Sequence, residues 1–455
     1  MNISKLKLCS ALVLFSLSNS TLAESAIEVG DFNFHGYVKS GTLWNDQGMG
    51  SDSFRLTDMG RYRLGNENET KVDLSPDLMF NHSSGAWART KVRFQSETRN
   101  TSDWAVDSST FVTREAFAEI GGLPQLPDTM LFWAGKRYMK NRSSHILDWD
   151  YHQANGTGGG IWGIPLTNNI LMDLDLVSWG KEGYTKDPIE GVGYADTLIF
   201  KPRLEFILSD KDSLKVEAFW MNLEHNPVKE CDEGFTCNPD VADDGFAVTV
   251  AYDRAGGFMG LGDTGYTEFV VQYGTGMGAG TNMSKFGWGE ANYKDQSSYR
   301  FTLSGISEFD NWAIQPVAIY HNDDDFTQAG GERVWWTVGA RPSYHFNEFF
   351  SLQFEAGYEH LKQNNTTQET NNGANGGMTK LTIAPTLHLE KGYWARPQLR
   401  VFATYAKWDE SLKNINTGKH GYSNYEPNQG FGPGGASYAG KTEGFNFGIQ
   451  AEVWF

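Results

Sequence analysis

The chain has 455 residues, with 38 lysines and arginines against 56 aspartates and glutamates, and a formal net charge of −18 at pH 7. This excess of negative charge argues against a nucleic-acid partner, because a phosphate backbone is bound by basic surfaces. Aromatic residues make up 14% of the chain, yet the mean hydropathy is −0.47, which is too polar for a bundle of membrane-spanning helices.

The chain begins with the pattern of a secretory signal peptide. Two lysines precede an apolar stretch, residues 8–17, that is too short to span a bilayer as a helix, and Ala23 offers a small residue for cleavage. A buried core helix is the alternative interpretation. We expect residues 1–23 to be a signal peptide and residues 24–455 to form a single barrel domain, because no long apolar run follows.

Most of the mature chain alternates between apolar and polar residues in short segments, which is typical of strands with two different faces. In residues 32–40, phenylalanines alternate with polar side chains, and residues 61–74 alternate in the same way. The clearest case is the end of the chain, where an apolar face ends on the aromatic Phe455.

Two arrangements of such strands are compatible with the pattern. A soluble β-sandwich would turn its apolar faces inward, whereas a membrane barrel turns them outward. The segments fill the whole chain and long polar loops alternate with short turns, which favours the second. We therefore predict an all-β fold, a transmembrane antiparallel β-barrel. Glycine, asparagine and aspartate predict long external loops near residues 141–165, 226–246, 363–377 and 409–441.

Two cysteines, Cys231 and Cys237, remain after removal of the signal peptide. In an oxidising compartment so close a pair predicts a disulfide that pins a loop. Zinc is the weaker alternative, because no second cysteine or histidine pair lies nearby at ligand spacing. The acidic residues 321–325 offer oxygen ligands for calcium, but a solvated loop is the simpler interpretation. We predict no metal and no cofactor.

Three aromatic residues share a face with polar side chains. Trp454 is two positions from Glu452, and Tyr37 is two positions from Lys39. Trp394 is an even number of positions from nearby arginines, and residues at such a spacing lie on the same side of a strand. Sugar rings stack their C–H faces on aromatic rings, while their hydroxyls need hydrogen-bonding groups alongside. Such a line of aromatic residues predicts a sugar path, and the alternative is an aromatic girdle at the membrane interface.

Several blocks of residues occur in an order that identifies a family. They are Phe34-His35-Gly36-Tyr37, Tyr62-Arg63-Leu64-Gly65-Asn66-Glu67, Trp133-Ala134-Gly135-Lys136-Arg137, Phe269-Val270-Val271-Gln272-Tyr273, Trp335-Trp336-Thr337-Val338-Gly339 and the run from Arg400 to Glu410. The chain resembles the maltoporin family of sugar-specific porins over nearly all of its mature length. The resemblance implies an 18-stranded barrel, a homotrimer, and a third loop that folds inward and narrows the pore.

The resemblance also implies roles for individual residues. The aromatic slide of the family matches Tyr37, Trp104, Phe269, Trp394 and Trp454, with the tryptophan at Trp104 contributed by a neighbouring subunit. A further slide tyrosine is absent, because that position holds Lys71. The polar track of the family matches Lys39, Arg63, Asp73, Arg114, His145 and Asp148.

The predicted constriction departs from the family pattern. Asn141 stands where maltoporins have an arginine, and Asp150 stands where they have a blocking tyrosine. Both residues resemble the sucrose porins, and their shorter side chains predict a wider opening. Gln153 matches neither group, and the N-terminal coiled coil of the sucrose porins is absent. Ordinary variation of a loop sequence is the alternative explanation.

These observations predict a porin for passive, facilitated diffusion of di- and oligosaccharides, either maltodextrins or sucrose, across the outer membrane. The expected partners are the sugar, outer-membrane lipid and two further copies of the chain, with no nucleic acid. A general diffusion porin with structural aromatics is the alternative. We predict no enzymatic activity, because His145 and Asp148 are accompanied by no convincing nucleophile.

Overall fold

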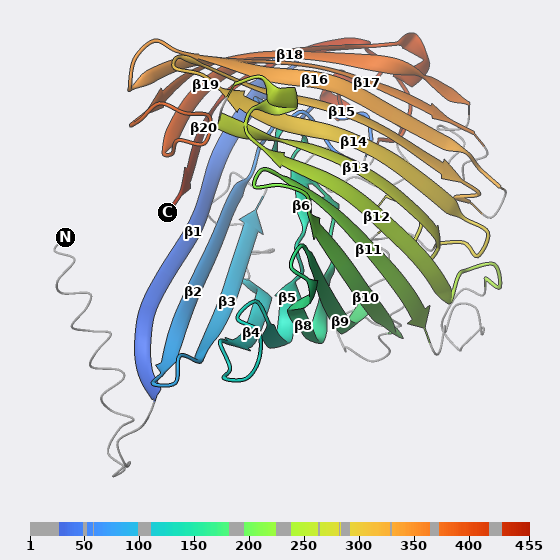
Figure 1. Cartoon of the computed structure of the whole chain (residues 1–455). Helices are drawn as coiled ribbons and strands as arrows, with labels where there is room; N and C mark the ends of the chain where they lie inside the picture. Colours follow the sequence, from blue (N-terminus) through green and yellow to red (C-terminus); the bar gives the residue numbers. More distant parts are fainter. Residues whose placement is uncertain are drawn as a thin grey trace.

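The computed structural model describes most of the chain after residue 26 (Figure 1). It covers residues 27–48, 52–57, 59–98, 111–181, 195–223, 238–262, 264–281, 283, 292–327, 330–364, 373–417 and 430–455. The predicted signal peptide, Trp104, Cys231 and Cys237 lie outside the described residues. Within the described part of the chain, no helix is both long and apolar enough to cross a membrane.

Eighteen antiparallel strands form one closed sheet, and each strand pairs with its neighbours along the chain. Pairing of the first barrel strand with the last closes the ring. The strands are β1 (Ile27–Asn45), β2 (Thr70–His82), β3 (Trp87–Thr98), β4 (Val112–Gly121), β5 (Leu131–Tyr138), β8 (Asn155–Thr167), β9 (Ile170–Lys181), β10 (Ala195–Ile207), β11 (Asp212–Leu223), β12 (Asp244–Ala255), β13 (Thr264–Gly276), β14 (Ser297–Glu308), β15 (Trp312–Asp324), β16 (Arg333–His345), β17 (Phe350–Gln363), β18 (Ala374–His388), β19 (Gln398–Trp408) and β20 (Glu443–Trp454). The predicted 18-stranded barrel is confirmed.

The two faces of the strands have opposite chemistry. Along β20, Phe445, Phe447 and Ile449 are exposed on the outside, and the intervening side chains, including Gln450 and Glu452, are buried inside. The period of two in the sequence therefore separates a lipid-facing band from a polar lumen. Short turns join the strands at one end of the barrel, which is the periplasmic end in such proteins.

Residues 61–69 do not form the strand that their sequence predicts. The alternating pattern over 61–74 predicts a strand, but β2 begins only at Thr70. The residues before it fold into the barrel, where Tyr62 contacts Thr337 through an Oη–Oγ1 hydrogen bond of 2.7 Å. The ring of Tyr62 lies against Gly339 and Gly357, where any Cβ would collide with it.

The connection between β5 and β8 also folds inward. It contains β6 (Arg142–Ser144), the short 3₁₀ helix η1 (His145–Leu147) and β7 (Trp149–His152), so β8 begins well inside the predicted loop 141–165. Arg142 Nη1 donates to Asp253 at 2.8 Å and to Glu268 at 2.6 Å, across the lumen on β12 and β13. These charge-assisted hydrogen bonds fix the loop to the far wall.

The two inward segments share one hydrophobic core with the barrel wall. Phe54, Tyr62 and Trp149 are among its buried members, and Trp149 meets Trp335 of β16 edge-on at 5.7 Å between ring centroids. Each large apolar side chain buried in this way contributes about 1.5–3 kcal/mol. The buried core residues of the wall come from β12, β13 and β15–β19.

The other predicted loops fall between strands, with shifted limits. β12 begins at Asp244 and β18 at Ala374, so both predicted loops extend into a strand. The connection from β19 to β20 contains the 3₁₀ helices η5 (Glu410–Leu412) and η6 (Ala436–Tyr438), and a further one, η3 (Phe258–Gly260), follows β12. Figure 1 shows the strands sweeping round the barrel in chain order.

Candidate functional site

Three of the predicted aromatic residues form a continuous line on the lumen side. Tyr37 on β1 pairs in register with Trp454 on β20, and their rings stack with 6.3 Å between centroids. Trp394, in the turn between β18 and β19, lies 6.1 Å from Trp454 by the same measure. The rings come from both ends of the chain, and closure of the barrel brings them together.

Phe269 was predicted to belong to the aromatic line, but the structure places it elsewhere. It points outward from β13, is 43% exposed, and pairs in register with Tyr252 and Leu303. Its neighbours Glu268 and Gln272 point inward and contact the inward loop. The strand period of two therefore places Phe269 among the lipid-facing residues.

Two other aromatic residues extend the line and were missed in the sequence. Tyr393 lies 5.0 Å from Trp394, and Tyr266 packs with Trp394 against a cluster formed by Ile306, Ala313 and Tyr393. Tyr266 has the inward parity of Glu268, which is the signal that could have identified it. Tyr393 offers no such signal, because it lies in a turn.

A single carboxylate organises the charges beside these rings. Glu452 is 1% exposed and accepts from the Tyr37 hydroxyl at 2.9 Å, from Arg63 at 2.9 Å and from Arg400 at 2.7 Å. Arg396 joins the same carboxylate at 2.8 Å, and its guanidinium lies 3.8 Å above the ring of Trp454. Cation–π contact and ion pairing together hold the ring in place.

The predicted polar track is assembled on one side of the lumen. Lys39 Nζ donates to Glu67 and Glu69 at 2.6 Å each, and Arg63 pairs with Glu67 at 3.1 Å. Asp73 accepts from Arg93 at 3.1 Å. Arg114 donates to Gln95 at 2.5 Å. The sequence did not identify these partners, which are Glu67 and Glu69 for Lys39, Glu67 for Arg63, Arg93 for Asp73 and Gln95 for Arg114.

The tip of the inward loop completes the track. Arg63 Nη1 contacts His145 Nδ1 at 2.9 Å, and burial together with the charge of Arg63 holds the pKa of His145 well below its usual value. His145 therefore stays neutral and accepts the hydrogen bond. Its ring lies 4.9 Å from Trp394, between the track and the aromatic line.

Asp148 follows η1 in the left-handed conformation, with φ 49°. This conformation turns its carboxylate toward Arg61, at 3.3 Å. The side chain of Asp148 is 32% exposed. Its partial desolvation opposes ionisation, but the positive charges of Lys39, Arg63, Arg61 and Lys71 prevail and hold its pKa well below the usual range. The tip is therefore charged and faces the track residues.

A cavity of about 460 Å³ lies between the aromatic line and the loop tip. Its lining combines the aromatic platform, the track and the loop, namely His35, Gly36, Tyr37, Lys39, Arg63, Lys71, Asp73, Ser75, Lys91, Arg93, His145, Asp148, Asp150, Glu452 and Trp454. Ring faces beside charged hydrogen-bonding groups suit an amphipathic, hydroxyl-rich solute.

The two predicted constriction residues lie beside different cavities. Asp150 lines the cavity that holds Tyr37 and Trp454, whereas Asn141 lines a second cavity of about 590 Å³ next to β11–β13. Asn141 Oδ1 also accepts from the backbone N–H of Ala154 at 3.0 Å, which closes the base of the loop. Asp150 is therefore the residue of this pair that faces the aromatic line.

A closed barrel with a lipid-facing outer band and a charged lumen partly filled by inward loops defines an outer-membrane porin. The LamB porin family model matches residues 32–455, and the chain belongs to this family. It is a channel of the outer membrane and not an enzyme.

Two solved structures are similar to this chain at low sequence identity. OmpT of Vibrio cholerae, an outer membrane protein solved in a trimer form, is 13% identical over 94% of this chain and 100% of that chain, with a TM-score of 0.43. OprD of Pseudomonas aeruginosa is 9% identical over 95% of each chain, with a TM-score of 0.46.

Proposed function

We propose that this porin is selective for sugars and carries di- and oligosaccharides by passive, facilitated diffusion. The observation that supports this most strongly is the line Tyr37–Trp454–Trp394, with charged hydrogen-bonding groups on both sides. An aromatic ring that faces water gains little unless a partly apolar solute stacks on it.

The proposed path follows this line through the lumen. A sugar enters from the long-loop end, lays its C–H faces on the rings, and exchanges hydroxyl hydrogen bonds with Lys39, Arg63 and the loop tip. It then passes Asp150 toward Trp394 and the periplasmic end. Binding has to be weak enough for release, and no cofactor or energy source takes part.

A general diffusion porin is the competing function, and reconstitution in a planar bilayer distinguishes the two. We expect maltotriose to block the ion current reversibly at about millimolar concentration, as weak stacking sites do. Sucrose is tested in the same membrane. Current that is insensitive to both sugars would support general diffusion.

The preferred sugar depends on the constriction. We infer that Asn141 and Asp150 leave a wider passage than an arginine and a tyrosine would, which suits a bulky, kinked disaccharide such as sucrose. Asp150 carries most of this argument, because it lines the cavity beside Tyr37 and Trp454.

Restoring the larger side chains tests the constriction. The double variant Asn141→Arg with Asp150→Tyr is expected to lower single-channel conductance and sucrose flux on the order of twofold, because pore width sets both. Asp150→Tyr alone should produce most of this decrease. Asp295→Tyr, at an exposed position in the long connection before β14, is the matched control. Unchanged sucrose flux in the double variant would refute the constriction assignment.

Assembly and export complete the proposal. We infer a homotrimer in which Trp104 of each chain reaches a neighbouring channel, removal of residues 1–23 on export, and a loop disulfide between Cys231 and Cys237. Electrophoresis of unheated and heated samples tests the trimer. Mass spectrometry of the purified protein reports both the new N-terminus and the oxidation state of the cysteines.

A further inference from the structure

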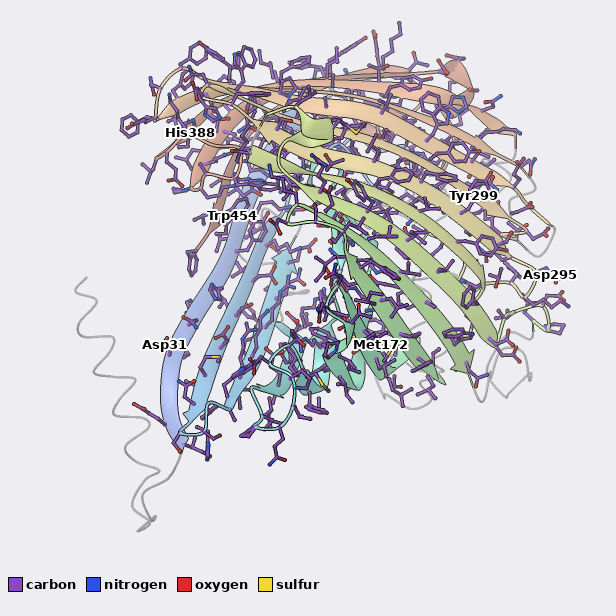
Figure 2. The ribbon with its side chains drawn as sticks, in the orientation of Figure 1. Asp31, Met172, Asp295, Tyr299, His388 and Trp454 are labelled. Atoms are coloured by element: carbon purple, nitrogen blue, oxygen red, sulfur yellow. The ribbon has the colours of Figure 1, made fainter. Side chains whose placement is uncertain are left out.

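A patch of buried polar side chains that carry unpaired hydrogen-bonding atoms lies on the inner wall at the short-turn end. It consists of Ser343 and His345 on β16, Ser351 on β17 and His388 on β18, all 4% exposed or less. Among the described residues, both ring nitrogens of His345, Nε2 of His388 and both serine hydroxyls have no partner. Figure 2 places His388 at the same end of the barrel as Asp31 and opposite Asp295.

The strand register brings these side chains together. His345 pairs with Ser351, and Ser351 pairs with Thr386, which is two residues before His388 on the same face. The two imidazole rings are 5.2 Å apart between centroids, with 71° between their planes. His388 Nδ1 donates to the carbonyl oxygen of Glu348 at 2.9 Å, which leaves the lone pair of Nε2 free.

Such an arrangement needs an explanation, because each unpaired buried polar group costs about 1–3 kcal/mol. A bound ion or water is the usual reason. When two imidazoles bind one tetrahedral ion through nitrogens at about 2.0–2.1 Å, their ring centroids are roughly 5 Å apart. The observed separation and the steep interplanar angle fit this geometry.

We propose that His345 and His388 hold a divalent transition-metal ion of the zinc, nickel or copper class. Neutral imidazole nitrogens are the ligands that these ions prefer. The Ser351 hydroxyl and water would complete the coordination shell. The site is separate from the aromatic line and does not depend on the proposed sugar selectivity.

One nearby charge opposes a cation at this position. The ammonium group of Lys391 interacts electrostatically with His345, and it is held at the edge of the patch by a 2.8 Å hydrogen bond to Asn311. The positive charge should weaken metal binding, so its removal provides a variant that is expected to gain affinity.

The test is calorimetric titration of the tag-free, chelator-treated, full-length protein with zinc chloride and nickel chloride. We expect one ion per chain. His345→Gln and His388→Gln should each weaken binding about tenfold or more, since a ligand contributes at least as much as its supporting residues. Lys391→Gln should tighten it. Circular dichroism of each variant verifies that the barrel has formed.

A matched control is His360→Gln. His360 is on the outward face of β17, its Nδ1 also lacks a partner among the described residues, and its ring stacks on Trp336 at 5.6 Å. Binding should be unchanged in this variant. Zinc-edge X-ray absorption should show scattering from two imidazoles in the wild type. Absence of binding, or equal binding by the wild type and the His345→Gln/His388→Gln double variant, would overturn the proposal and leave water as the partner of these nitrogens.

Discussion

Trp454→Ala is expected to weaken sugar block of the ion current about fivefold, because loss of one aromatic contact costs about 1 kcal/mol. Trp454 is the central ring of the line, in contact with both Tyr37 and Trp394. Open-channel conductance should not fall, because the substitution removes volume from the lumen. Titration of maltotriose against bilayer current measures both quantities.

Phe269→Ala is the matched control for this experiment. Phe269 is an aromatic residue of the same barrel, but it faces lipid, so the half-blocking sugar concentration should equal that of the wild type. If the half-blocking sugar concentration of Trp454→Ala also equals that of the wild type, Trp454 does not contact the sugar, and the aromatic line is structural.

Glu452→Gln is expected to destabilise the barrel by about 3 kcal/mol, because removing one partner of a buried ion network leaves uncompensated charges. The carboxylate of Glu452 is shared by Arg63, Arg396 and Arg400. An amide retains its size but not its charge. Urea unfolding in lipid vesicles, followed by tryptophan fluorescence, measures the loss.

The same variant should also shift ion selectivity toward anions, since three guanidinium groups would face the lumen with less compensating charge. Glu443→Gln on the same strand is the control. Glu443 lies at the long-loop end of β20 and accepts an exposed hydrogen bond from Tyr405 at 2.7 Å. Its loss should change stability by no more than about 0.5 kcal/mol. Equal unfolding midpoints for the two variants would contradict the role assigned to Glu452.

The fold was predictable to the extent that it depends on local alternation. The period of two along β20 predicts its lipid-facing and lumen-facing sides, and the structure agrees. The same pattern over residues 61–69 led to a wrong prediction. Tyr62 and Leu64 alternate with polar side chains there, but they pack against β16–β19 inside the barrel. A period of two in the sequence shows that a segment has an apolar face and a polar face. It does not show whether lipid or the barrel interior covers the apolar face.

The site was predictable only where parity and family resemblance agreed. Tyr37 and Trp454 met both criteria and lie side by side. Phe269 rested on resemblance alone, and the lumen-facing aromatic nearby is Tyr266. The convergence of three arginines on Glu452 could not be predicted, because it depends on closure of the barrel between β1 and β20 and on the inward segment that carries Arg63.

Liposome swelling with the purified protein tests the central claim most directly. Sucrose, maltose and maltotriose are compared at equal osmolarity. Sugar-selective passage with an open constriction predicts that sucrose enters faster than maltose, although both are disaccharides of the same mass. Equal rates for the two disaccharides, with a slower rate for the trisaccharide, would be the size dependence of a general diffusion pore and would contradict the account.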